Sequence, residues 1–238
     1  MYFSPYRMYF DPTYILVIAG AIICLLASAK VKSTYAKFSK VQSMSGYTGA
    51  SAAEAILRRA GIYDVRIQRV SGNLTDHYDP RNKTLNLSDS VYGSSSVAAI
   101  GVAAHECGHA IQHATHYAPL SIRSAIVPVV NLGTNVAWLF IIAGLFITSS
   151  TGNILLMIGV LAFSLGVLFQ LVTLPVEFNA SNRALRILEE SGILRNDENY
   201  GARKVLSAAA LTYVAGAVSS ILQLLRILLI IGGNRRDD

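Results

Sequence analysis

Charged residues are scarce in this sequence. Asp, Glu, Lys and Arg make up 14% of its 238 residues, whereas hydrophobic residues make up 53%. Charged residues form about a quarter of a typical soluble domain, and the mean hydropathy here is +0.44. The deficit argues against an ordinary soluble protein, and the long apolar runs that accompany it indicate a protein of the lipid bilayer.

The sequence also has few cysteines and no pattern typical of nucleic-acid binding. The two cysteines, Cys24 and Cys107, form neither a CxxC pair nor a disulfide framework, which fits a reducing compartment. No basic cluster is interleaved with aromatic residues, so no nucleic acid is expected as a partner. The net charge of +6 favours contact with a membrane surface instead.

Four apolar stretches reach the roughly 20 residues needed to cross a bilayer. They lie at about residues 12–29, 124–148, 154–174 and 206–231. The last contains Arg226, which must snorkel toward an interface unless the span is shorter than it looks. Ala27-Ser28-Ala29 resembles a signal cleavage site. However, most basic residues follow the first stretch rather than precede it, so an uncleaved anchor is expected.

Basic residues predict the topology. Eleven Lys and Arg lie between the first two spans and five between the third and fourth, so sixteen of the twenty fall on one side. The termini carry only Arg7, Arg235 and Arg236. The positive-inside rule makes the side with sixteen basic residues cytoplasmic. Both termini are then expected outside.

Residues 30–123 have the pattern of a small α+β insert. Residues 48–60 predict an amphipathic helix that stops at Gly61. Residues 65–70 and 84–88 alternate as strands do, and the stretch between them is rich in turn residues. Residues 94–119 predict one helix, capped by Ser94 or Ser95 and limited by Pro119.

The last of these helices contains VAAHECGHAIQH, in which His105, Glu106 and His109 form an H-E-x-x-H pattern. The two histidines lie one turn apart on one face, so both can bind one zinc ion. Glu106 beside them is placed to act as general base. The alternative is a core helix with an incidental glutamate, but an unpaired charge on an apolar helix is costly, and a zinc site compensates it.

A catalytic zinc ion needs three protein ligands. His113 lies about 12 Å along the helix from His105, too far to share the ion. Glu177 is the acid nearest a predicted membrane exit, on a helix that Pro175 is expected to begin, and it is the favoured third ligand. Glu177 can alternatively be only a favourable charge at a helix start, and His77 or the acids after residue 188 are the remaining candidates.

HECGH followed by EFNAS resembles the gluzincin pattern, in which a downstream glutamate completes the site. Over nearly its whole length the chain resembles the bacterial neutral zinc metallopeptidases of the YugP type, on LTDHYDPRNKTLNLS, SVAAIGVAAHECGHAIQH, YAPL and PVEFNASNRAL. More distantly, it is similar to HtpX and the CAAX prenyl endopeptidases. The resemblance implies a bacterial inner-membrane zinc endopeptidase with His105, His109 and Glu177 as ligands and Glu106 as base.

The resemblance also identifies candidate supporting residues. Gluzincins carry an aspartate where this chain has Ser181, so Ser181 or Asn182 is expected to orient the first histidine. In zincins an extended substrate pairs with an edge strand, and residues 84–88 are the candidate strand. His77 or Tyr78 is a candidate oxyanion donor, unless that stretch forms only a turn.

The expected fold is a mainly α multi-pass membrane protein with a small α+β zincin-like catalytic insert. Its expected segments are an outside N-terminus with the first transmembrane helix (1–29), the cytoplasmic insert (30–123), two transmembrane helices (124–174), a cytoplasmic helix with the third ligand (175–205), and the fourth transmembrane helix with the tail (206–238).

The expected function is zinc-dependent hydrolysis of peptide bonds in membrane or membrane-proximal proteins, with one Zn²⁺ per chain. Protein or peptide substrates and the lipid bilayer are the expected partners, and the sequence leaves a homo-oligomer open. A zinc-dependent amidase of a small substrate shares the same site. A non-catalytic, zinc-stabilised scaffold that binds a partner is a further alternative.

Overall fold

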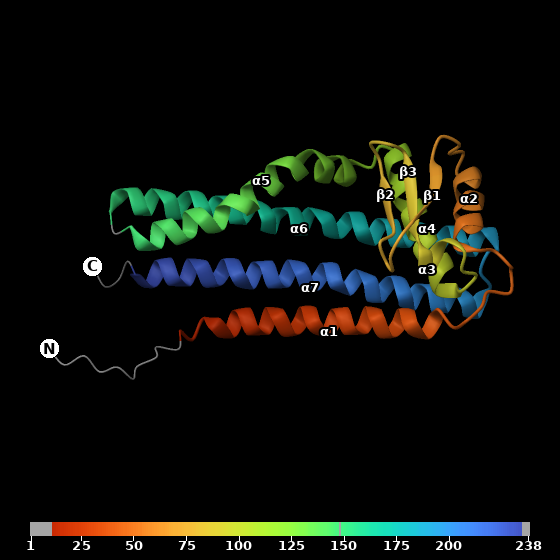
Figure 1. Ribbon diagram of the computed structural model, residues 1–238, viewed down its shortest axis with the longest axis horizontal. Coiled ribbons are helices and arrows are strands. Elements are labelled where there is room, and N and C mark those ends of the chain that lie inside the picture. Colours follow the sequence, from red (N-terminus) through yellow and green to blue (C-terminus); the bar gives the residue numbers. More distant parts are fainter. Residues whose placement is uncertain (1–10, 148, 235–238) are drawn as a thin grey trace. The chain divides into compact units, whose positions relative to one another are not determined.

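The computed structural model describes residues 11–147 and 149–234. Arg7, Arg235 and Arg236, on which the topology prediction partly rests, lie outside these residues. In chain order the described elements are α1 (Tyr14–Phe38), α2 (Gly49–Arg59), β1 (Arg66–Val70), β2 (His77–Asp79), β3 (Thr84–Ser88), α3 (Asp89–Tyr92), α4 (Val97–Ala114), α5 (Ala118–Phe146), α6 (Ser150–Ser191) and α7 (Asn196–Asn234) (Figure 1). The fold is mainly α with a small three-stranded sheet, which confirms the expected mainly α protein with a small α+β insert.

Four of these helices, α1, α5, α6 and α7, are long and apolar enough to cross a membrane. α6 and α7 contain the third and fourth predicted spans and extend beyond them. α1 and α5 overlap the first and second predicted spans, but α1 begins two residues later than predicted and α5 ends at Phe146. The prediction that Pro175 begins a separate helix was wrong, because α6 continues through it to Ser191. Proline inside a helix costs about 3 kcal/mol. Val176, Ala180 and Ala184, which follow at helical spacing and are fully buried, provide the packing that offsets this cost.

The chain divides into two compact units, and all four long helices contribute to both. One unit contains residues 1–26, 128–170 and 215–238. In it, the Arg226 guanidinium lies 3.6 Å from the Asp11 carboxylate and 4.2 Å from the centre of the Tyr14 ring. The charge of the arginine is therefore compensated within the unit by an anion and an aromatic face.

The second unit, residues 27–127 and 171–214, contains the sheet. The strand order is β1-β3-β2, with β1 parallel and β2 antiparallel to β3. The sequence predicted β1 and β3 but missed β2, which lies in the turn-rich stretch. β3 was expected to be an edge strand, and this was wrong, because it pairs on both sides and is buried along its length. β1 and β2 are the edge strands on either side of β3 (Figure 1).

Helices α2 and α4 pack together into the core of this unit. Thr48 caps α2 through a hydrogen bond from the Ser51 amide, and Gly61 follows the helix at φ +72°. α4 is capped by Ser96, whose hydroxyl accepts from the Ala99 amide at 3.2 Å, so the predicted caps at Ser94 and Ser95 were wrong by one or two residues. α4 ends at Ala114, and Pro119 lies in the first turn of the next helix, α5.

Candidate metal centre

The two histidines of the H-E-x-x-H pattern project from the middle of α4. Their ring centroids are 4.8 Å apart and the rings are nearly perpendicular. The opposite face of α4 is anchored in the core, where the buried Cys107 thiol contacts the Ala53 carbonyl of α2 at 3.6 Å. Burial raises the pKa of that thiol well above its ordinary value. Cys107 therefore acts as a core residue and is turned away from the histidines.

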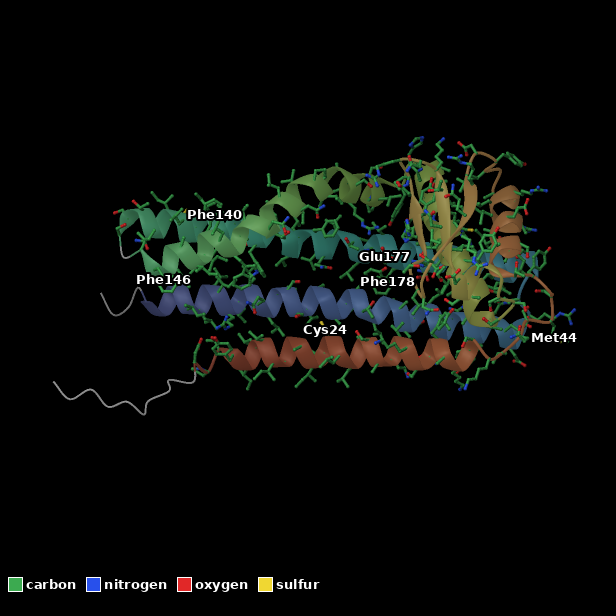
Figure 2. All side chains as sticks on the ribbon, viewed as in Figure 1. Cys24, Met44, Phe140, Phe146, Glu177 and Phe178 are labelled. Carbon is green, nitrogen blue, oxygen red and sulfur yellow. The ribbon has the colours of Figure 1, made fainter. Side chains whose placement is uncertain are left out.

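Helix α6 approaches α4 very closely at Gly108. A Cβ atom on Gly108 would lie 2.5 Å from the Ala180 carbonyl oxygen, so only glycine permits this backbone contact. Glu177, which is labelled in Figure 2, lies on α6. In the sequence of this helix it precedes Ala180 by less than one turn. The close contact therefore brings the Glu177 side chain, which is 3% exposed, beside the two histidines. Glu177 lies inside α6 rather than at a helix start, so the helix-dipole alternative is excluded.

Three potential ligand atoms converge at this point. The Glu177 Oε2 atom lies 3.3 Å from His105 Nε2 and 3.4 Å from His109 Nε2, and the three ligand atoms all lie within 4.8 Å of one another. Tetrahedral zinc with bonds of about 2.0–2.1 Å separates neighbouring ligand atoms by about 3.3–3.4 Å. Glu177 Oε2 is also buried without a hydrogen-bond partner among the described residues. Donor type, spacing and this unpaired oxygen all fit a zinc ion.

Hydrogen bonds orient both imidazoles. Ser181 Oγ lies 3.1 Å from His105 Nδ1, and Gln112 Oε1 lies 3.0 Å from His109 Nδ1. The Gln112 amide nitrogen donates to the Val176 carbonyl at 2.8 Å and to Asn179 Oδ1 at 3.0 Å, so Gln112 Oε1 must accept from His109. This tautomer leaves the His109 Nε2 lone pair facing Glu177.

Asn182 and Gln112 depart from the sequence expectation in opposite ways. Asn182 is exposed on α6, and the structure does not bring it to the site. Gln112 is fully buried and was missed as an orienting residue. Its position three residues after His109, on the same helical face, is the signal that identifies it in retrospect.

Arg123 of α5 is a further unpredicted neighbour. Its Nη1 atom lies 3.4 Å from Glu177 Oε1. The two carboxylate oxygens of Glu177 therefore have separate surroundings, one cationic and one between the histidines. An arginine between two predicted spans carried no sequence signal for this role.

A cavity of about 270 Å³ opens over these groups. Glu106, which is 8% exposed, lines it together with both histidines and Glu177. Tyr78 from β2 and Tyr213 from α7 line it as well. Tyr213 was missed because it lies within the fourth predicted span, where a tyrosine ordinarily marks the membrane interface.

His77 and Tyr78 differ in what they offer the cavity. His77 Nδ1 donates to the Thr75 carbonyl at 2.9 Å, so its Nε2 accepts from the Asn86 amide at 3.2 Å. Both ring nitrogens are thus used, which leaves His77 neither a ligand nor a donor here. The Tyr78 hydroxyl lies 2.8 Å from His113 Nδ1. Burial raises the pKa of Tyr78 to about 12, so its phenol stays protonated at neutral pH.

The acids after residue 188 do not join the site. Glu198 is buried and accepts hydrogen bonds from the Met44 amide at 2.7 Å and the Arg195 amide at 2.8 Å. It therefore fixes the loop after α1 to the start of α7. Among the described residues, the potential metal-binding group found contains only His105, His109 and Glu177.

A zinc-ligand set on two packed helices, with an acid beside it in a cavity, is the arrangement of a zinc hydrolase. Residues 13–232 match the family described as "Putative neutral zinc metallopeptidase", and the chain belongs to this family.

A relative, the "Putative membrane protease YugP" of Bacillus subtilis (strain 168), is 48% identical over 223 residues, which cover 94% of this chain and 98% of that protein. No solved structure matches the chain. Family and relative together support a membrane zinc protease.

Proposed function

We propose that this protein is a membrane-embedded zinc endopeptidase with one zinc ion per chain. The observation that carries the proposal is the convergence of His105, His109 and Glu177 within 4.8 Å, with Glu106 lining the same cavity. Three ligands leave a fourth position open, as in catalytic zinc sites. A closed structural site would need a fourth ligand, and Cys107, the nearest soft donor in sequence, is directed into the core.

His105, His109 and Glu177 would hold the zinc ion. When bound, zinc supplies Lewis acidity toward a substrate carbonyl and activates a water molecule near neutral pH. Ser181 and Gln112 keep the two imidazoles in the required orientation. Arg123 balances part of the Glu177 charge from the side away from the histidines.

Glu106 is the general base. Its carboxylate accepts a proton from the attacking water at the cavity and then delivers that proton to the nitrogen of the leaving amine. It is not part of the converging ligand set, which leaves its oxygens available for proton transfer. Burial among small residues of α4 keeps bulk water from competing for this carboxylate.

The edge strand β2 is the proposed site of substrate pairing, in place of β3. Pro80 and the residues from Asp76 to Tyr78 line the cavity, so a substrate extended along β2 passes over Glu106. Main-chain hydrogen bonds to an edge strand supply affinity with little sequence dependence. The candidate donors to the oxyanion that develops on the scissile carbonyl are two tyrosine hydroxyl groups that line the cavity. The Tyr78 hydroxyl can donate to the oxyanion when His113 Nδ1 donates to it, and Tyr213 is the second donor.

The proposed substrates are membrane or membrane-proximal proteins, and the proposed side is the cytoplasm of a bacterial inner membrane. Arg123, Glu177 and Tyr213 all belong to helices that also carry a candidate span, which favours substrates held at the bilayer. The distribution of basic residues supports the cytoplasmic side.

The test compares membranes that contain the wild-type protein with membranes that contain Glu106→Gln. Glutamine preserves the size of the side chain but cannot accept the proton, so we expect a loss of roughly 10²–10⁴-fold in hydrolysis. Peptide products are identified by mass spectrometry, and zinc content is measured on the purified proteins.

Zinc should be retained at about one ion per chain in both forms. Equal peptide products from both forms would remove Glu106 from the mechanism. Absence of zinc in both, even after titration, would remove the proposal itself. Hydrolysis of small amides without peptide products would identify an amidase, and retained zinc without any hydrolysis in the wild type would identify a scaffold.

A further inference from the structure

A second cavity, separate from the metal centre, lies between α1 and α7. It has a volume of about 550 Å³. Three lysines line it, Lys30 and Lys37 from α1 and Lys204 from α7. The family assignment and the proposed hydrolysis give these lysines no task.

The cavity is formed by one face of each helix. Lys30, Ser33, Thr34 and Lys37 follow the i, i+3, i+4, i+7 spacing of one face of α1. On α7, Lys204, Ser207, Ala208 and Leu211 have the same spacing, and Tyr200 lies about one turn before Lys204. The helices meet at Phe38, because a Cβ atom on Gly201 would lie 2.8 Å from the Phe38 ring. Both faces therefore line one defined recess rather than a diffuse charged surface.

The charges of the three ammonium groups are not neutralised by the described residues. In the part of the chain that the structure describes, none of them forms an ion pair with a carboxylate. Lys204 lies 5.0 Å from the centre of the Tyr200 ring and Lys37 lies 5.4 Å from the Phe38 ring. Three like charges around one recess repel each other unless an anion binds among them.

The end of the cavity nearer the predicted spans offers apolar surface beside a basic residue. Lys30 immediately follows the first predicted span, and basic residues at that position attract anionic lipid. Ala208 and Leu211 line the cavity and lie within the fourth predicted span, whereas Phe38 lies at the other end, where the helices meet. A free phosphate would use the lysines and the hydroxyl groups of Thr34 and Ser207 but would leave the apolar surface of Ala208 and Leu211 unused.

We propose that this cavity binds the phosphate group of an anionic phospholipid. Lys30, Lys37 and Lys204 contact the phosphate charge. The hydroxyl groups of Thr34 and Ser207 donate hydrogen bonds to its oxygens, and the acyl chains lie on Ala208 and Leu211. The site is independent of the zinc chemistry and exists whether or not the protein hydrolyses peptides.

The experiment uses the purified full-length protein in a neutral detergent, with bound lipid counted by native mass spectrometry. Phosphatidylglycerol supplies the anionic phosphate with acyl chains, phosphatidylcholine supplies the chains with no net charge, and glycerol phosphate supplies the anion without chains. We expect the wild-type protein to bind phosphatidylglycerol most tightly.

The variants separate the cavity from general surface charge. A basic residue near an anionic lipid contributes about 1 kcal/mol, or about fivefold in affinity. The triple change Lys30→Gln, Lys37→Gln, Lys204→Gln should therefore weaken phosphatidylglycerol binding about a hundredfold. The matched control, Lys32→Gln with Arg203→Gln, removes charge from the same helices outside the cavity and should stay within about twofold of the wild type.

A triple Lys→Arg variant keeps the charge and should keep binding. The glutamine variant should also melt near the wild-type temperature. These two results together would show that its loss of binding does not come from misfolding. Unchanged binding in the glutamine triple variant, or an equal loss in the control, would overturn the site. Equal binding of phosphatidylcholine would overturn charge recognition. Binding of glycerol phosphate as tight as that of phosphatidylglycerol would overturn a lipid as the occupant.

Discussion

At the scale of single residues, the metal centre depends on polar groups that hold the ligands in place. Gln112 and Ser181 each bond the Nδ1 atom of one histidine. Losing such a partner typically lowers metal affinity tenfold to a hundredfold, because the imidazole loses its preferred tautomer and orientation. The two residues therefore provide a test of the centre that leaves all three ligands unchanged.

We predict that Gln112→Ala and Ser181→Ala each lower zinc affinity roughly tenfold to a hundredfold. Glu177→Gln should lower it more, because a neutral amide is a poor zinc ligand. Zinc affinity is measured by competition with a chromophoric chelator. Asn182→Ala, which changes an exposed residue on the same helix, is the control and should bind zinc as the wild type does.

Full zinc affinity in Glu177→Gln would refute Glu177 as the third ligand. Full affinity in Gln112→Ala would mean that His109 needs no amide to fix its tautomer. A loss in Asn182→Ala as large as in Ser181→Ala would show that the effect is a general weakening of α6.

Tyr78 gives a prediction with a pH dependence. Burial raises the pKa of Tyr78 from 10.0 to about 12, so the folded protein holds this proton more tightly than the unfolded chain does. The stability that this difference contributes is complete below pH 10 and is lost as the pH rises from 10 to 12. The phenol therefore remains a hydrogen-bond donor throughout the working range of an enzyme.

Tyr78→Phe should lower kcat roughly 10²-fold, as expected for loss of one oxyanion donor. The ratio of the wild-type and variant rates should stay constant between pH 6 and about 10, because the Tyr78 hydroxyl does not titrate there. Rates are measured on the same peptide across this range. A ratio that changes steadily through neutral pH, or a variant as fast as the wild type, would contradict the assignment.

Sequence reasoning at this scale succeeded where the interaction is local. His105 and His109 lie one helical turn apart, so their spacing alone predicts a shared face, and their rings do lie 4.8 Å apart. The role of Glu106 as general base stays a prediction. Gln112 was missed because its amide bonds to Val176 and Asn179, which are 64 and 67 residues away in the sequence. No local pattern reports such a contact.

At the scale of elements, the crossing of α4 and α6 determines whether the site forms. Gly108 is the only glycine between His105 and His109 on α4. A Cβ atom at this position would lie 2.5 Å from the backbone of α6. A larger residue must therefore separate the helices, because a backbone atom cannot rotate away as a side chain can. Glu177 would move with α6.

Gly108→Ala should therefore destabilise the protein by roughly 1–3 kcal/mol and also weaken zinc binding. Thermal unfolding with and without zinc, together with zinc titration, measures both effects. Gly93→Ala is the matched control, because its Cβ would meet nothing within 4 Å and its φ of −98° is open to alanine. If Gly108→Ala melts and binds zinc as the wild type does, the close crossing is not required.

Element prediction worked for continuous periodic stretches and failed at pairing and at proline. The three residues of β2 are too few for an alternation to be visible, and their strand conformation depends on pairing with β3. The position of β3 in the middle of the sheet depends on two partners and cannot be deduced from its own five residues. Pro175 has the local pattern of a helix start, but packing along α6 overrides that preference.

At the scale of the whole molecule, the distribution of basic residues predicts on which side of the membrane the site lies. Sixteen of the twenty Lys and Arg lie in residues 30–123 and 175–205. These two segments also contain His105, His109 and Glu177. Moving these charges across an energised membrane is unfavourable, which is the basis of the positive-inside rule. The rule predicts a cytoplasmic site and an outside connection between α5 and α6.

Single cysteines test this topology in intact cells. Asn82→Cys and Thr151→Cys replace exposed residues, one in the insert and one near the start of α6, in a background with Cys24→Ser. Cys107 can remain, because it is fully buried and its raised thiol pKa leaves little thiolate to react. An impermeant maleimide should label Thr151→Cys in intact cells and Asn82→Cys only after permeabilisation. Labelling of Asn82→Cys from outside would invert the topology and place the substrates in the cell envelope, while zinc binding and the role of Glu106 would be unaffected.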